Sequence, residues 1–271
     1  QVIGADAEGS TVLSETMAQY SALMVMEKEF GPANMRRFLE SELNSYLVGR
    51  STERQKEMPL ELVENQPYIH YNKGSLVMYA LRDYIGEARM NAAIRGFLNA
   101  TKFRGPPYPT SLQLVDSLRA ATPDSLKYLI GDLFEHITLY ELKTDSVTME
   151  PAPGGGYAVD LYVNAKKLRA DSLGKETEQP MEDWIDIGVF AKAPPKPDRT
   201  IDPKIGVELY FQKHRIRSGA QKITVVVGGH PYRAGIDPLH KLIDRITTDN
   251  TVGIRDRSRA AVTRTSAPRR P

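Results

Sequence analysis

The stretch VLSETMAQYSALMVMEKEFG, residues 12–31, has the apolar content of a largely buried helix. Gly31 is typical of the left-handed residue that follows the last turn of a helix. Glu15 lies within this apolar run, where a carboxylate must be paired, bound to a cation or turned toward water. Its helical neighbours three and four residues away include no cation: they are Thr11, Val12, Ala18 and Gln19.

Two interpretations of Glu15 follow from its surroundings. If Thr11 is the N-cap, Glu15 lies close to the first turn, where an acidic side chain is favoured by the helix dipole. Otherwise the partner of Glu15 comes from another part of the polypeptide or is a bound cation.

The first half of the chain is predicted to be helical. Pro32 suits the first turn of a second helix, and Gly86 suits the end of a later one. Apolar residues at spacings of 3, 1, 4, 3 and 1 from Met35 onward lie on one helical face. The expected helices cover about residues 11–30, 32–48, 73–85, 87–100, 111–121 and 123–136, with an irregular polar segment at 50–70.

After Lys143 the pattern changes to the alternation of half-buried strands, as in GYAVDLYV at 156–163. The predicted fold class is therefore α+β, a mainly helical part followed by a small antiparallel β-sandwich and a disordered tail. The predicted domains are residues 1–143, 144–249 and 250–271, the last a basic tail rich in Arg, Ser, Thr, Ala and Pro.

Composition excludes several classes of function. The net charge of +2 includes +5 from residue 255 onward, so the rest carries about −3 and is not suited to nucleic acid. With no cysteine, the chain has no disulfide, thiolate zinc site or cysteine nucleophile. The basic tail is interpreted as a solvated end, with contact to a membrane surface or an acidic partner as the alternative.

Several motifs of metal, nucleophilic and nucleotide chemistry are absent from the sequence. None of the five histidines belongs to an HExxH or HxxEH pattern, and no GxSxG nucleophile elbow or P-loop occurs. From the residues alone, a complete zinc site within this sequence is not expected. YIHYNKGS at 68–75 draws attention to Tyr71, which packs as an ordinary core tyrosine on the simplest interpretation.

The sequence nevertheless resembles the aminopeptidase N family of gluzincin zinc aminopeptidases. LSETMAQYSALMVMEKEFG is similar to the family's NEGFAxY helix, with Glu15 at the zinc-binding glutamate, and YNKGSLVMYALRDYIGE to its YEKGxxVLxxLxxxxGE segment, with Tyr71 at the catalytic tyrosine. The resemblance is closest to the aminopeptidase-like domain fused to bacterial ABC-type permeases, which AGIDPLHKLIDRITTDN at 234–250 also resembles. The sequence departs from the family pattern at Ser14 for Asn, Thr16 for Gly and Asn72 for Glu.

The resemblance implies a mechanism. Two histidines and Glu15 would hold Zn²⁺ with one open position for water, and Tyr71 would donate a hydrogen bond to the oxyanion of the tetrahedral intermediate. The substrate would be a peptide with a free amino terminus. Gln19 and Lys73 are candidates for supporting or cleft positions near the metal.

The family's HExxH does not occur in these residues, and its usual place is just upstream of Gln1. The resemblance therefore implies a C-terminal fragment of a metallopeptidase, inactive alone. The missing upstream part of the polypeptide would include a permease region and provide membrane association, whereas the fragment itself would be soluble. The alternatives are a non-catalytic peptide-binding or interaction module of a transporter, and a purely structural domain in which Glu15 and Tyr71 lie apart.

Overall fold

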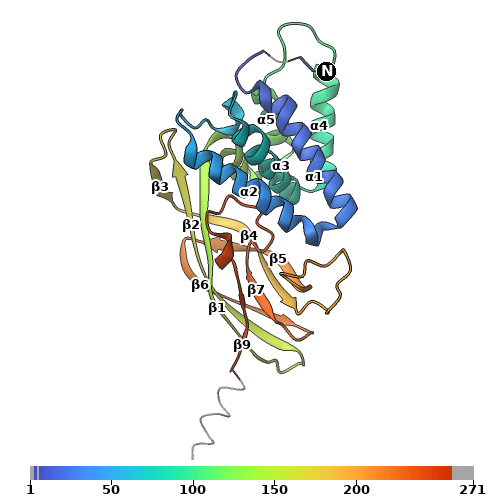
Figure 1. Cartoon of the computed structure of the whole chain (residues 1–271), viewed down its shortest axis with the longest axis vertical. Helices are drawn as coiled ribbons and strands as arrows, with labels where there is room; N and C mark the ends of the chain where they lie inside the picture. The colour runs from blue at the N-terminus through green and yellow to red at the C-terminus, as the bar shows by residue number, and fades with distance from the viewer. Residues whose placement is uncertain (1–2, 5, 258–271) are drawn as a thin grey trace, which may run out of the picture. The chain divides into compact units, whose positions relative to one another are not determined.

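The computed structural model describes residues 3–4 and 6–257, and its architecture is α+β, as predicted (Figure 1). The chain divides into two compact units. The first takes in residues up to 139 together with 168–178 and 241–243, and the second takes in 140–167, 179–240 and residues from 244 onward. Within residues 3–4 and 6–257, no helix has the length and apolar character needed to cross a membrane.

The first unit contains every described helical element except the 3₁₀ turn Thr247–Asp249, which lies in the second unit, and the helix ends follow local chemistry. Gly31 and Gly86 both adopt positive φ, 81° and 88°, and end helices whose last turns they close with backbone hydrogen bonds. Thr110 forms a capping box with Gln113. The helical elements are the π-helical turn Val12–Thr16, α1 Met17–Phe30, the 3₁₀ turn Pro32–Asn34, α2 Met35–Thr52, the 3₁₀ turn Leu60–Leu62, the π-helical turn Tyr68–Lys73, α3 Gly74–Ile85, α4 Glu87–Thr101, α5 Ser111–Ala121, the 3₁₀ turn Asp124–Leu126, α6 Tyr128–Ile130 and the π-helical turn Gly131–Glu135.

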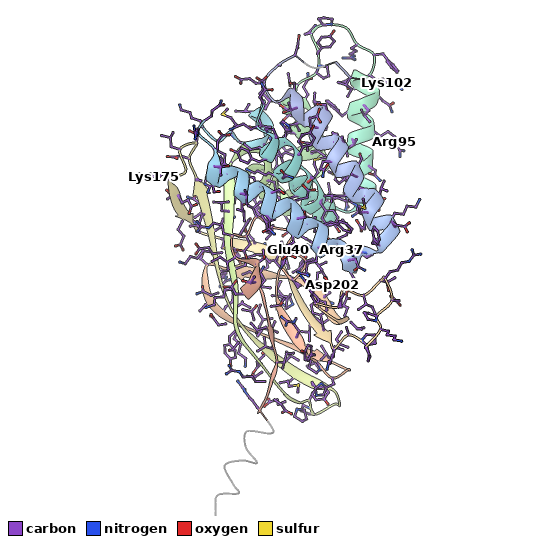
Figure 2. The ribbon with its side chains drawn as sticks, in the orientation of Figure 1. Arg37, Glu40, Arg95, Lys102, Lys175 and Asp202 are labelled. Carbon is purple, nitrogen blue, oxygen red and sulfur yellow. The ribbon has the colours of Figure 1, made fainter. Side chains whose placement is uncertain are left out.

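Helix α2 shows how the apolar pattern builds the core of the first unit. Met35, Leu39, Leu43 and Tyr46 are fully buried, as their helical spacing predicts. The opposite face is charged, and Arg37 there stacks over the ring of Phe30 at 4.7 Å. Figure 2 shows the charged side chains of this surface, with Arg37 and Glu40 on α2 and Arg95 on α4.

Two open sheets contain the strands. One has the order β3-β2-β1-β9, with β6 also pairing with β2, and the other has the order β5-β4-β7-β8. Along β2, Val159, Leu161 and Val163 are buried in alternation, as predicted for GYAVDLYV. The strands are β1 Ile137–Pro151, β2 Tyr157–Ala170, β3 Glu176–Gln179, β4 Glu182–Ala191, β5 Val207–Arg217, β6 Gly219–Val227, β7 Arg233–Ile236, β8 Thr251–Gly253 and β9 Arg255–Asp256.

The structure differs from the sequence-based prediction in three respects. Both sheets are open, and β1 pairs with β9 in parallel over two residue pairs, so the predicted small antiparallel β-sandwich is not shown. The strands begin at Ile137 rather than after Lys143. Each compact unit is made of several separate segments of sequence, so a single boundary between residues 143 and 144 does not divide them. The described part of the predicted disordered tail, residues 250–257, includes β8 and β9; the rest of the predicted tail, 258–271, lies outside the described residues.

Candidate active site

Glu15 and Tyr71 converge on one another within the first unit. The Tyr71 hydroxyl donates a short hydrogen bond to the Glu15 carboxylate across 56 residues of sequence. Tyr71 is 36% exposed, and Glu15 is half-buried, so the pair faces solvent rather than the core. This hydrogen bond, followed by burial and the charge of Glu15, raises the pKa of Tyr71 above its ordinary value. The partner of Glu15 is therefore a phenol hydroxyl from a distant segment.

Both residues lie in π-helical turns, Val12–Thr16 and Tyr68–Lys73. Single π-helical turns are frequent at functional sites. Thr11 precedes the first turn but does not cap it through its side chain: it has helical backbone angles, and its hydroxyl donates to the Val63 carbonyl oxygen at 2.9 Å. An N-cap side chain accepts from the first turn, whereas this one donates to another segment.

A direct link holds the two turns together. The Thr16 hydroxyl donates to the His70 carbonyl oxygen at 2.5 Å, and Thr16 is fully buried. These two residues are the neighbours in sequence of Glu15 and Tyr71, respectively. The contact therefore joins a side chain of one turn to the backbone of the other.

Gln19 does not contact Glu15 through any hydrogen bond in the described structure, but it belongs to a second link. Its side-chain amide donates to the Glu42 carboxylate of α2 at 2.7 Å, and the amide of Asn72 donates to the same carboxylate at 2.6 Å. Asn72 follows Tyr71 directly, so Glu42 of α2 links α1 to the second π-helical turn. A glutamate at position 72, as in the family pattern, would place a second negative charge beside Glu42.

His70 also lies at this site, although no sequence pattern had marked it as a functional residue. Its ring lies edge-on to the ring of Tyr71, with centroids 4.7 Å apart, and its Nδ1 has no hydrogen-bond partner among the described residues. Burial lowers the pKa of His70, and the charge of Glu15 opposes that effect. The only available sequence signal was its position next to Tyr71.

Lys73 is enclosed by the core of the first unit. It is 1% exposed, its ammonium group lies 5.6 Å from the centre of the Tyr46 ring, and it has no hydrogen-bond partner in the described part of the chain. Burial lowers the pKa of Lys73 to about 8, although the charge of Glu57 opposes the shift. A side chain held in this way does not line an open cleft.

The buried ammonium group of Lys73 should make stability depend on alkaline pH. Between pH 8 and 10.5 the unfolded chain binds more protons at Lys73 than the folded chain, so folded stability rises with pH in that window. Relative to Lys73→Met, the wild type should gain up to about 3 kcal/mol of unfolding free energy across this range. Urea unfolding at several pH values measures the difference. The exposed Lys127→Met is the control, and a wild-type advantage that is flat with pH would contradict this account.

The side chains at this site include one that could bind a zinc ion. Glu15 offers one carboxylate at a partly exposed position, as a zinc ligand requires. Among residues 3–4 and 6–257, no group of three or more His, Asp or Glu side chains is arranged to hold a metal. The described residues therefore fit one ligand position and do not complete a zinc site.

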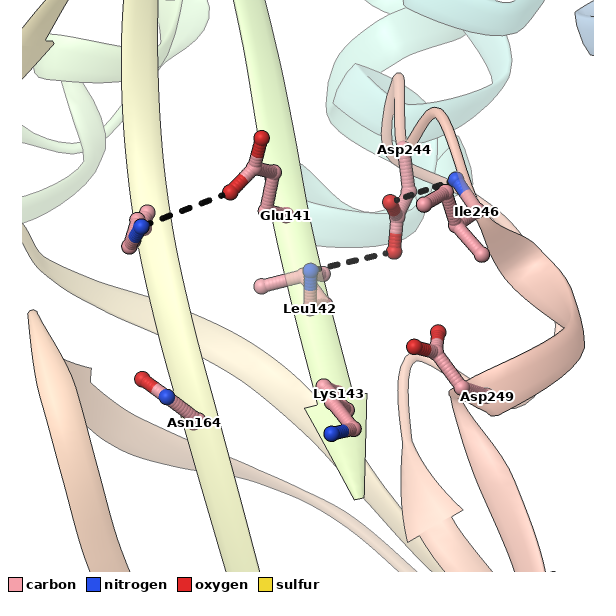
Figure 3. Close-up of a pocket in the computed structure, with 8 residues that line it drawn as sticks. Glu141, Leu142, Lys143, Asn164, Asp244, Ile246 and Asp249 are labelled. Carbon is pink, nitrogen blue, oxygen red and sulfur yellow. Dashed lines mark hydrogen bonds and ion pairs between the residues drawn. The ribbon is translucent and has the colours of Figure 1, made fainter. Parts of the chain in front are cut away.

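The second unit contains a separate pocket of about 260 Å³ (Figure 3). It lies between strands β1 and β2 and the segment that carries Asp244 and Asp249. The Asp244 carboxylate accepts hydrogen bonds from the backbone N–H groups of Leu142 at 3.2 Å and Ile246 at 3.1 Å. Burial raises the pKa of Asp244 to about 7. Residues of the first unit do not line this pocket, so it is distinct from the site of Glu15 and Tyr71.

Comparison with known proteins gives little further information. No protein-family model and no curated protein matches the sequence. The chain is similar to the crystal structure of Legionella pneumophila aminopeptidase A in complex with aspartic acid, with a TM-score of 0.49 and 13% sequence identity. The match covers 88% of this chain and 24% of that one, so the chain spans about a quarter of that protein's length. A likeness at this level carries no argument about function.

Proposed function

We propose that this chain is part of a zinc aminopeptidase, in which Glu15 is a metal ligand and Tyr71 stabilises the oxyanion formed during peptide hydrolysis. One observation carries the proposal: the hydroxyl of Tyr71 meets the carboxylate of Glu15, although 56 residues separate them. The order and spacing of the two sequence motifs predict the same pairing. The structural alternative, in which these two residues lie apart, is inconsistent with this contact.

The remaining zinc ligands would come from an HExxH helix outside these 271 residues, because the sequence contains no such motif. A bound zinc ion supplies Lewis-acid chemistry. The chain described here would hold the ion through Glu15 and would be inactive by itself. One carboxylate is not a site, so we expect only weak zinc binding by the 271 residues alone.

Tyr71 has the properties of an oxyanion donor. Its phenol is protonated at neutral pH, as a hydrogen-bond donor must be, and the hydrogen bond to Glu15 raises its pKa further above the ordinary value. Its partial exposure leaves room for a substrate carbonyl. Because its turn is tied to that of Glu15 through Thr16 and His70, the donor and the ligand are held in a fixed relation before substrate arrives.

The proposed substrate is a peptide with a free amino terminus, and the proposed partner is a permease region of the same polypeptide that confers membrane association. An assay should use a protein that combines these residues with an HExxH helix. We expect it to release the first residue of a free peptide and to leave the N-acetylated form of the same peptide intact. Binding of the free peptide without cleavage, in the presence of zinc, would instead favour a non-catalytic peptide-binding module.

A further inference from the structure

A buried threonine lies beside the site of Glu15 and Tyr71 and contacts neither side chain through a hydrogen bond in the described structure. Thr16 is fully buried, and its hydroxyl donates to the carbonyl oxygen of His70 at 2.5 Å. A threonine in a helix commonly donates to a carbonyl of its own preceding turn. Here the hydroxyl reaches a different segment, at the backbone position next to Tyr71.

Gly74 makes this contact possible. A Cβ added at Gly74 would lie 2.4 Å from the hydroxyl oxygen and 2.8 Å from the methyl carbon of Thr16. The backbone angles of Gly74 are ordinary helical ones, φ −59° and ψ −45°, so conformational freedom is not why a glycine is needed. The missing side chain is what lets the Thr16 side chain lie against the second turn.

The π-helical turn explains why the carbonyl oxygen of His70 can accept a hydrogen bond from another segment. In a π-helical turn the usual i−4 pattern of backbone hydrogen bonds is shifted, so carbonyl groups there can take donors from outside the helix. The carbonyl of His70 lies in such a turn, Tyr68–Lys73. A buried hydroxyl that met no acceptor would destabilise the fold, so the bond fixes both partners.

We propose that Thr16 is a positioning residue that, with Gly74, holds the two π-helical turns in the register that brings the Tyr71 hydroxyl to Glu15. Its consequence for catalysis rests on the function proposed above. The glycine usual in the resembling family has no side chain for this bond. This chain therefore uses a hydroxyl where the family pattern leaves space.

The test measures the Tyr71–Glu15 contact in the 271-residue chain, without zinc or substrate. The reporter is the ¹³Cζ NMR signal of Tyr71, identified by its loss in Tyr71→Phe, with Glu15→Ala as the reference for a phenol that has lost its acceptor. Thr16→Val keeps the shape of the side chain but removes the donor, and should move the signal toward the Glu15→Ala position. Thr16→Ser keeps the hydroxyl and should hold the signal at the wild-type position.

Thr122→Val is the matched control. Thr122 is 3% exposed, and its hydroxyl donates to the Leu118 carbonyl oxygen at 2.8 Å, away from this contact. This variant should lose thermal stability, as Thr16→Val does, and leave the Tyr71 signal unchanged. An unmoved Tyr71 signal in Thr16→Val, or an equal movement in Thr122→Val, would overturn the positioning role.

If Thr16→Val does not fold, Gly74→Ala keeps the test decisive. Gly74→Ala should lower the melting temperature sharply in the protein that keeps Thr16. The same substitution should lower it much less in Thr16→Gly, because that protein has no side chain at position 16 for the added methyl group to meet. Equal losses in both backgrounds would contradict the inference. None of these measurements involves zinc, so failure of zinc binding to Glu15 would reject the proposed function and leave the positioning role standing.

Discussion

Tyr71→Phe should lower kcat for peptide hydrolysis by about 100- to 1,000-fold in a protein that joins these residues to an HExxH helix. The substitution removes only the hydroxyl, which donates to the Glu15 carboxylate and is proposed to donate to the substrate oxyanion. A donor directed at developing charge acts mainly in the transition state, so kcat should fall more than KM changes. Zinc should still bind, weakened by no more than about 10- to 100-fold, because the lost hydroxyl also supports the Glu15 carboxylate; competition with a chelating dye measures the affinity.

Tyr20→Phe is the control for this substitution. Tyr20 also lies in the NEGFAxY-like segment, but its buried hydroxyl has no hydrogen-bond partner among the described residues. Removing that hydroxyl breaks no contact, so turnover should remain near the wild-type rate. Wild-type turnover in Tyr71→Phe would remove the role assigned to Tyr71, whatever the control shows.

Glu15→Ala should weaken zinc binding by at least about 100-fold in the same protein. Loss of a partner that merely supports a ligand already costs 10- to 100-fold in affinity, so loss of the ligand itself should cost more. Activity should disappear with the metal and should return only partly at high zinc concentration. Isothermal titration with Zn²⁺ measures the affinity.

The control for Glu15→Ala is Glu40→Gln, which removes a carboxylate from α2 that pairs with Arg36 at 3.0 Å. It should lose this partly buried ion pair and bind zinc as the wild type does. Unchanged zinc affinity in Glu15→Ala would show that the carboxylate is not a ligand, and the function would then have to be sought in peptide binding.

The helical half of the fold could be predicted because the residues that begin and end its helices act through local backbone geometry and capping. Gly31 and Gly86 end helices at positive φ, and Thr110 begins one with a capping box. The π-helical turns could not be predicted, because an apolar pattern read over four or five residues does not separate a π turn from an α turn. Strands β8 and β9 were missed since they are short and polar, and they are ordered by pairing with β7 and β1.

The site was predictable only in part. Local physics established that Glu15 had no cation within its own helix, and the family resemblance supplied Tyr71 as a companion. The bond from Thr16 to His70 depends on where a backbone carbonyl lies in three dimensions, which no residue pattern records. The family resemblance made Lys73 a candidate for a supporting or cleft position, but tertiary packing directs its side chain onto Tyr46.

The most direct test of the central claim is an anomalous difference map at the zinc absorption edge, from crystals of the protein that contains both these residues and an HExxH helix. Our account predicts one peak at about 2.0–2.2 Å from a carboxylate oxygen of Glu15, with the Tyr71 hydroxyl beside the open position. A peak whose ligands exclude Glu15, or a fully zinc-loaded protein without a peak at this carboxylate, would contradict it.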